Sequence, residues 1–128
     1  MGGTETILIV DDEEMILSVG KTMLEKIGYH VLTAAGGRQA IKVYEADPAK
    51  IDMVVLDMVM PDLSGGDTYD RLKQIDPEIK VLLSSGYSID GQASDILNRG
   101  CNGFIQKPFN LKALSRKVRE ILDHKSVF

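Results

Sequence analysis

Four acidic residues in a row, Asp11 to Glu14, directly follow an apolar run that ends at Val10. A second apolar run, residues 53–56, is followed by another carboxylate, Asp57. Carboxylates that share one pocket disfavour each other's charged forms. A hard divalent cation such as Mg²⁺, which binds oxygen ligands, would relieve that repulsion. If the fold places Asp57 next to Asp11 and Asp12, the three carboxylates would therefore form a magnesium site.

The acidic run also has a purely structural interpretation. Asp12 would serve as the N-cap of a following helix, and Glu13 and Glu14 would lie favourably at the positive end of the helix dipole. The loop contains no glycine, whereas dinucleotide and P-loop sites place glycines at this point to cradle phosphate. The sequence therefore argues against those two nucleotide sites and leaves both interpretations of Asp12 open.

Two further side chains with useful chemistry follow later apolar runs. Lys107 comes after residues 103–106, and its ammonium together with Mg²⁺ would balance three carboxylates. Ser85 follows residues 80–84 and supplies a hydroxyl, with space beside it at Gly86. The alternatives are a surface lysine, a turn serine and, for Asp57, a capping or turn residue. Pro108 follows the lysine, and the bond before a proline can be cis.

The elements that must position these residues can be predicted from the pattern of hydrophobicity. Five short apolar runs are each followed by a segment with helical periodicity: residues 6–10, 29–34, 52–56, 80–84 and 103–106. Strands that alternate with helices indicate a parallel sheet, and nearly continuous apolar strands indicate helices on both faces. Sites in such sheets lie beyond the carboxyl ends of the strands, where the residues described above are expected to meet.

The helices have their own signals. The first carries an apolar stripe of Ile16, Val19, Met23, Leu24 and Ile27 and stops at Gly28. The others are expected at residues 38–46, at 66–75, from about 90 to before 100, and after a capping Asn110. In the loop between 57 and 66, Asp62 and Ser64 are interpreted as turn residues, with a positive φ at Gly65.

Length and composition limit the classes of protein. The 128 residues predict one domain over 1–128, with a core at about 6–122. A net charge of −4 argues against direct binding of nucleic acid. The longest apolar runs are four residues, which predicts no membrane insertion. A single cysteine, Cys101, and the lack of a visible secretion signal favour a reducing, cytoplasmic setting.

Taken together, these motifs resemble the receiver domain of two-component response regulators. The segment LDMVMPDLSG at 56–65 resembles the phosphoacceptor loop of that family. The pairs at 11–12 and 85–86 resemble its acidic pair and its hydroxyl switch position, and residues 107–109 resemble its lysine motif. The resemblance covers residues 6–122. It implies a flavodoxin-like (βα)5 α/β fold, a three-layer sandwich around a parallel five-stranded sheet of order 2-1-3-4-5.

The resemblance also implies roles for individual residues. Asp57 would accept a phosphoryl group from a phosphohistidine on a sensor histidine kinase or a phosphotransfer domain. Asp11 and Asp12 would hold Mg²⁺ together with Asp57 and the backbone carbonyl of Val59. The domain is therefore expected to be a phosphoacceptor in signalling and not an enzyme in its own right.

A conformational switch is implied as well. Lys107 and the Ser85 hydroxyl would contact the phosphoryl oxygens, and Phe104 stands at the position of the family's aromatic switch. We expect Ser85 to move inward on phosphorylation, to make room for Phe104, and to change the output face at residues 90–125. That face, made of the fourth helix, fifth strand and fifth helix, also allows a homodimer. Simple core packing is the alternative for Phe104.

Two other functions stay open. One is a docking module with the receiver fold and no phosphorylation. The other is a Mg²⁺-dependent aspartyl phosphatase, which is disfavoured because Val59 stands where that family has a second Asp. The chain would be a free regulator or the C-terminal receiver of a hybrid sensor kinase, and the segments 84–88 and 103–109 favour the second. Val59 and Tyr87 would crowd an attacking water, which predicts slow hydrolysis of the phosphorylated aspartate.

Overall fold

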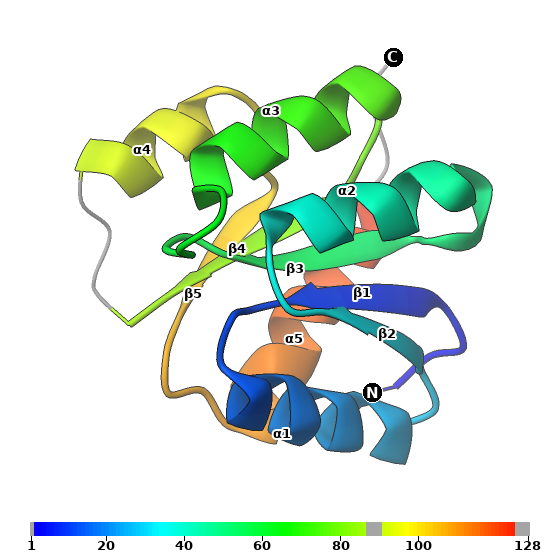
Figure 1. Cartoon of the computed structure of the whole chain (residues 1–128). Coiled ribbons are helices and arrows are strands. Elements are labelled where there is room, and N and C mark those ends of the chain that lie inside the picture. The colour runs from blue at the N-terminus through cyan, green and yellow to red at the C-terminus, as the bar shows by residue number, and fades with distance from the viewer. Residues whose placement is uncertain (1, 87–90, 125–128) are drawn as a thin grey trace.

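The computed structural model describes residues 2–86 and 91–124, in which strands and helices alternate as expected (Figure 1). A short 3₁₀ helix, η1 (Pro48–Lys50), precedes the third strand. The strands are β1 (Thr6–Val10), β2 (His30–Ala34), β3 (Met53–Asp57), β4 (Val81–Ser85) and β5 (Gly103–Gln106). The helices are α1 (Glu14–Lys26), α2 (Gly37–Ala46), α3 (Gly65–Ile75), α4 (Gly91–Asn98) and α5 (Leu111–Asp123).

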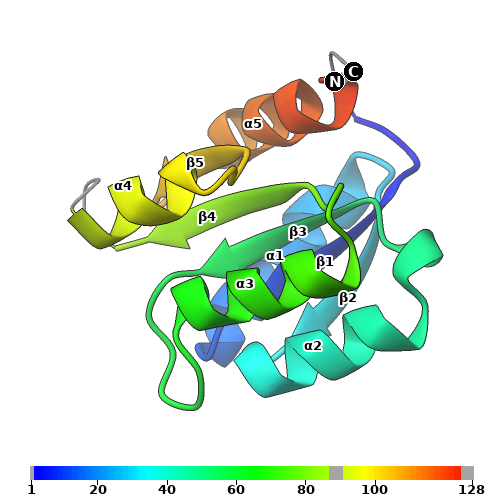
Figure 2. The same ribbon diagram turned by 90° about the horizontal axis from the view of Figure 1, so that it is seen from above.

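The five strands form one parallel sheet in the order β2-β1-β3-β4-β5, which confirms the predicted fold. Helices α1 and α5 cover one face, and α2, α3 and α4 cover the other (Figure 1). Figure 2 views the sheet from the side of α2 and α3. Asp57 is the last residue of β3 and pairs with Ser84 of β4, and Ser85 pairs with Gln106 of β5. The register thus brings the candidate residues to the same edge of the sheet.

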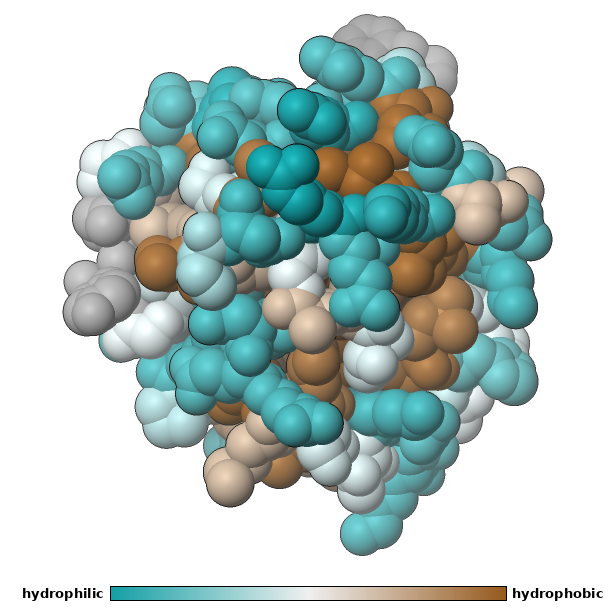
Figure 3. Space-filling view, in the orientation of Figure 1, coloured by the Kyte–Doolittle hydropathy of each residue, from teal (hydrophilic) through white to brown (hydrophobic). Residues whose placement is uncertain are grey.

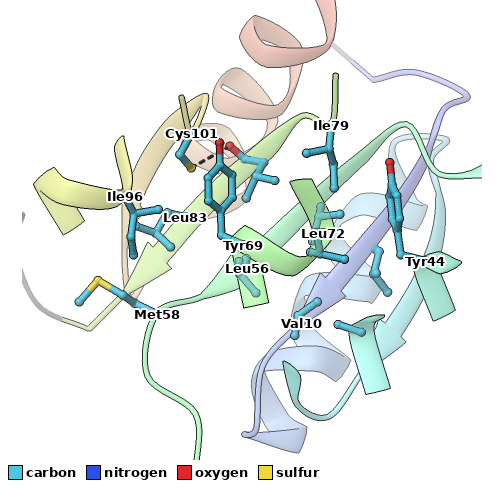
Figure 4. Close-up of a cluster of buried hydrophobic side chains, with 14 of the residues drawn as sticks. Val10, Tyr44, Leu56, Met58, Tyr69, Leu72, Ile79, Leu83, Ile96 and Cys101 are labelled. Carbon is cyan, nitrogen blue, oxygen red and sulfur yellow. Dashed lines mark hydrogen bonds between the residues drawn. The ribbon is translucent and has the colours of Figure 1, made fainter. Parts of the chain in front are cut away.

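The sheet carries a hydrophobic core on each of its faces because successive strand side chains point to opposite sides. In β1, Leu8 and Val10 belong to the core under α2, α3 and α4, whereas Ile7 and Ile9 belong to the core under α1 and α5. Figure 4 shows the first core, in which Tyr69 and Leu72 of α3 lie against the sheet. This burial on both faces explains why the strands read as continuous apolar runs.

The stripe predicted for helix α1 is confirmed in part, since Leu24 is buried and Met23 and Ile27 are partly buried against the same core. The buried residues of this helix are Leu17, Gly20 and Leu24, while Val19 is 46% exposed. A Cβ built on Gly20 would lie 3.0 Å from Cδ1 of Ile9, so the helix packs closely against β1 at this glycine. The prediction is wrong at Val19, and it missed Leu17 and also Gly20, which has no side chain to count as apolar.

The helix ends test several expectations. Asn110 caps α5 as predicted, since its Oδ1 accepts a hydrogen bond from the backbone N–H of Ala113 at 2.8 Å. Gly28, just beyond α1, has a φ of +103°, which suits a residue without Cβ. The N-cap of α1 is Glu13. The interpretation of Asp12 as that N-cap is therefore wrong.

The surface is mainly hydrophilic on the side seen in Figure 3, where hydrophobic residues are visible largely between polar ones. None of the helices in the described part of the chain has the length and apolar character needed to cross a bilayer.

Candidate functional site

The candidate residues surround a cavity of about 440 Å³ at the carboxyl edge of the sheet. Its lining includes Asp12, Asp57, Val59, Ser85, Gly86 and Lys107. These residues come from β3, β4 and the loops that follow β1, β3, β4 and β5. The fold therefore assembles one site from four separate parts of the sequence.

Lys107 connects two of the aspartates. Its Nζ lies 2.7 Å from Oδ2 of Asp11 and 3.0 Å from Oδ1 of Asp57. Asp11 is 1% exposed and Asp57 is 4% exposed. One carboxylate oxygen from each of Asp11, Asp12 and Asp57 lies within 4.8 Å of the others. The predicted convergence of three carboxylates and one ammonium is confirmed, and Lys107 is not a freely solvated surface lysine.

Local backbone structure holds Asp11 in place. Its backbone N–H donates to the carbonyl of Ala34 at 3.2 Å, which continues the β1–β2 pairing by one residue. Its Oδ1 accepts the backbone N–H of Glu13 at 2.9 Å, at the start of α1, and its Oδ2 accepts from Lys107. Asp12 is exposed and forms the open side of the cluster.

The buried charges perturb one another. Burial raises the pKa of Asp57 to about 6, and the negative charges of Asp11 and Asp12 add to this effect against the opposing influence of Lys107. Burial lowers the pKa of Lys107, but its bonds to Asp11 and Asp57 outweigh burial, and the net direction is upward. Three carboxylates thus face one ammonium. An additional divalent cation with oxygen ligands fits this donor set and this excess of negative charge.

The hydroxyl side of the site is built by β4. Ser85 is 2% exposed and lines the cavity, and its carbonyl accepts the backbone N–H of Lys107 at 2.7 Å. Among the described residues, a Cβ built on Gly86 would meet no atom within 4 Å apart from its chain neighbours, which leaves space next to Ser85 in this part of the structure. Phe104 is partly buried against the core under α2, α3 and α4. This position agrees both with an aromatic switch and with simple core packing, so it does not decide between the two. Tyr87 lies outside the described residues.

The loop between β3 and α3 departs from the prediction. Ser64 is the N-cap of α3, and its Oγ accepts the backbone N–H of Asp67 at 3.1 Å. Gly65 has no positive φ. It is needed for close packing instead, because a Cβ there would lie 2.6 Å from Cα of Met58 and 2.7 Å from the carbonyl oxygen of Asp57. The spacing Ser64-x-x-Asp67 before a helical segment was a signal for this cap.

The sequence did not predict that Asp62 makes a long-range contact. Its carboxylate accepts hydrogen bonds from the backbone N–H groups of Gly37 and Arg38 at the start of α2. The sequence held an indirect signal, since the glycines at 36 and 37 offer that helix no capping side chain.

A parallel sheet of order 2-1-3-4-5, with clustered aspartates and a lysine at its carboxyl edge, defines the class of CheY-like phosphoacceptor domains. This chain belongs to the response regulator receiver domain family, whose model matches residues 7–119. Members of this family serve as receivers in two-component signalling systems.

Individual relatives agree with this assignment. The chain is 36% identical over 123 residues to the sensor kinase CckA of Brucella abortus, a match that covers 96% of this chain and 13% of CckA. It is similar to a receiver domain from Clostridium thermocellum, with a TM-score of 0.88 and 31% identity over 93% of this chain and 94% of that one. It also resembles a chain of the CheX-CheY-BeF₃-Mg²⁺ complex from Borrelia burgdorferi, with a TM-score of 0.89 and 26% identity. The match covers 94% of this chain and 90% of that one.

Proposed function

We propose that Asp57 is the phosphoacceptor of a His-Asp phosphorelay. The observation that carries this proposal is the placement of its carboxylate, which is 4% exposed, lines an open cavity and lies 3.0 Å from the Lys107 ammonium. A desolvated, oriented carboxylate is a competent nucleophile. The donor would be a phosphohistidine on a sensor histidine kinase or a phosphotransfer domain.

The proposed reaction requires little more than positioning and neutralisation of charge. A carboxylate oxygen of Asp57 forms a bond to phosphorus while the bond from phosphorus to the imidazole nitrogen breaks, and the electron pair leaves with the imidazole. Because the transition state of phosphoryl transfer is loose, the charge on the phosphoryl oxygens must be balanced. Lys107 supplies a fixed positive charge for this purpose, and the Ser85 hydroxyl supplies a hydrogen-bond donor.

We assign the Mg²⁺ ligands to the carboxylates of Asp11, Asp12 and Asp57 and to the backbone carbonyl of Val59. The clustering of three carboxylate oxygens within 4.8 Å supports the first three. The CheX-CheY complex, whose description includes Mg²⁺ and BeF₃, offers further support from a relative. When bound, Mg²⁺ would neutralise these carboxylates and attract phosphoryl oxygens.

The response to phosphorylation is also part of the proposal. The modification adds about −1.5 to −2 charges and new acceptor oxygens. Ser85 would turn toward these oxygens, Phe104 would move into the space it leaves, and the face formed by α4, β5 and α5 would change its packing. An output partner or a second copy of the chain would bind this face. The match to CckA supports an origin in a hybrid kinase. A cytoplasmic location completes the proposal.

The test is uptake of phosphate from acetyl phosphate in the presence of Mg²⁺, measured by intact mass. We expect one phosphoryl group on the wild-type chain, none on Asp57→Asn, and one on the control Asp67→Asn, which removes an exposed carboxylate in the first turn of α3. Absence of uptake by the wild type would support a docking module. Uptake that persists in Asp57→Asn would refute the assignment of the acceptor, and catalytic release of phosphate from p-nitrophenyl phosphate would favour a phosphatase.

A further inference from the structure

Helix α2 depends on a distant residue for its N-terminal cap. Its own N-cap, Gly36, makes no side-chain capping bond. Asp62 supplies the missing acceptors: its Oδ1 accepts the N–H of Gly37 at 3.2 Å, and its Oδ2 accepts the N–H of Arg38 at 3.1 Å. These bonds hold the pKa of Asp62 below its ordinary value. The two oxygens of one carboxylate thus satisfy two amides at the positive end of this helix.

The glycines at the start of α2 permit this contact. A Cβ built on Gly36 would lie 2.8 Å from Oδ1 of Asp62, and one on Gly37 would lie 2.9 Å from Cβ of Leu63. Residues with side chains at these two positions would therefore push against the loop. The close approach therefore depends on the two glycines of α2 as well as on Asp62 and Leu63 of the loop.

Asp62 belongs to the acceptor loop, defined here as residues 58–64. The two ends of this loop are held near the sheet, because the N–H of Met58 donates to the carbonyl of Ser84 at 2.9 Å and the N–H of Gly65 donates to the carbonyl of Met58 at 2.9 Å. The loop also contains Val59, which is 59% exposed and lines the cavity. The bonds of Asp62 attach this outer part of the loop to α2.

We propose that Asp62 is a positioning residue for the cation site: by capping α2 it fixes the acceptor loop, and with it the backbone of Val59 at the cavity that Asp12 and Asp57 line. This inference rests on the proposed function, which makes the Val59 carbonyl a ligand of Mg²⁺. Contacts that orient a ligand without touching the metal commonly change metal affinity when they are removed. Asp62 would act on the carbonyl of Val59, three residues earlier in the chain, through the backbone of the loop.

The test is Mg²⁺ binding by the whole chain, measured by isothermal titration calorimetry without any phosphodonor. We expect Asp62→Ala to weaken the affinity about tenfold. Asp62→Asn, which retains one acceptor oxygen, should have a Mg²⁺ affinity between those of the wild type and Asp62→Ala. Ala40→Gly is the matched control, because it weakens α2 at a buried residue that takes no part in the hydrogen bonds of Asp62, and it should leave the affinity unchanged.

A double variant separates positioning from helix stability. Gly36→Asp in the Asp62→Ala background places a capping carboxylate on the N-cap of α2 itself, where the backbone is extended, with φ −177° and ψ 175°. The three nearest atoms that a Cβ at position 36 would meet belong to the Asp62 side chain, which Asp62→Ala removes. We expect the resistance of the double variant to urea to recover while its Mg²⁺ affinity stays low. Recovery of both would overturn the inference, as would equal affinities of wild type and Asp62→Ala. A wild type that binds no Mg²⁺ would overturn the proposed function and this inference with it.

Discussion

Replacing Asp57 by Asn should stabilise the metal-free protein at neutral pH. The pKa of Asp57 is raised from an ordinary 3.8 to about 6, chiefly by burial. At about 1.4 kcal/mol for each pKa unit, keeping this carboxylate charged in the folded state costs about 3 kcal/mol. Asn has nearly the same shape and no charge, so Asp57→Asn removes this cost. The gain should disappear on addition of Mg²⁺, because the proposed binding of Mg²⁺ to the folded wild type would stabilise it.

The sign of the pH dependence follows from the same shift. Well below the ordinary pKa of 3.8, Asp57 is protonated in both the folded and the unfolded chain, and the variant should have no advantage. Between pH about 4 and 6 the folded wild type keeps a proton that the unfolded chain releases, so the stability of the wild type falls relative to the variant as pH rises. Above the folded pKa of about 6 the difference reaches its full size.

Urea unfolding followed by circular dichroism in EDTA measures this difference at pH 4, 5, 6 and 7.5. Asp12→Asn is the matched control: it removes the same charge from an exposed position in the same site and should stabilise the protein by less than about 1 kcal/mol. A variant Asp57→Asn that is no more stable than wild type at pH 7.5, or a gain that does not change with pH, would refute the reasoning.

Three further substitutions test the contacts around the site by urea unfolding. Lys107→Met should destabilise by about 3 kcal/mol, more at pH 8 than at pH 5, because it leaves two buried carboxylates without their shared cation; equal losses at both pH values would contradict this. Gly65→Ala should cost about 2 kcal/mol, since its Cβ would overlap the backbone of Met58, and a neutral result would disprove the close packing. Asn110→Ala should cost about 1 kcal/mol by removing the cap of α5, and Asn110→Ser should recover most of it.

The sequence by itself determined the order of elements and the residues at the strand ends. Alternating apolar runs and helical segments predicted all five strands, each within one residue of its observed bounds. The parallel arrangement then required Asp57, Ser85 and Lys107 to share one edge. Periodicity and strand direction are local properties of the chain, so they can be read without knowledge of its tertiary contacts.

Only the tertiary structure decided which contacts those residues make. The stripe of α1 was wrong at Val19 and missed Gly20, a residue that hydrophobic periodicity ignores and that makes the close approach to β1. The Asp62 cap on α2 joins positions 25 and 24 residues apart, and no local pattern pairs them. The raised pKa of Asp57 depends on burial and on charges from another loop. Distances, solvent exposure and electrostatic coupling arise only when separate segments are packed together, and for that reason they could not be read from the order of the residues.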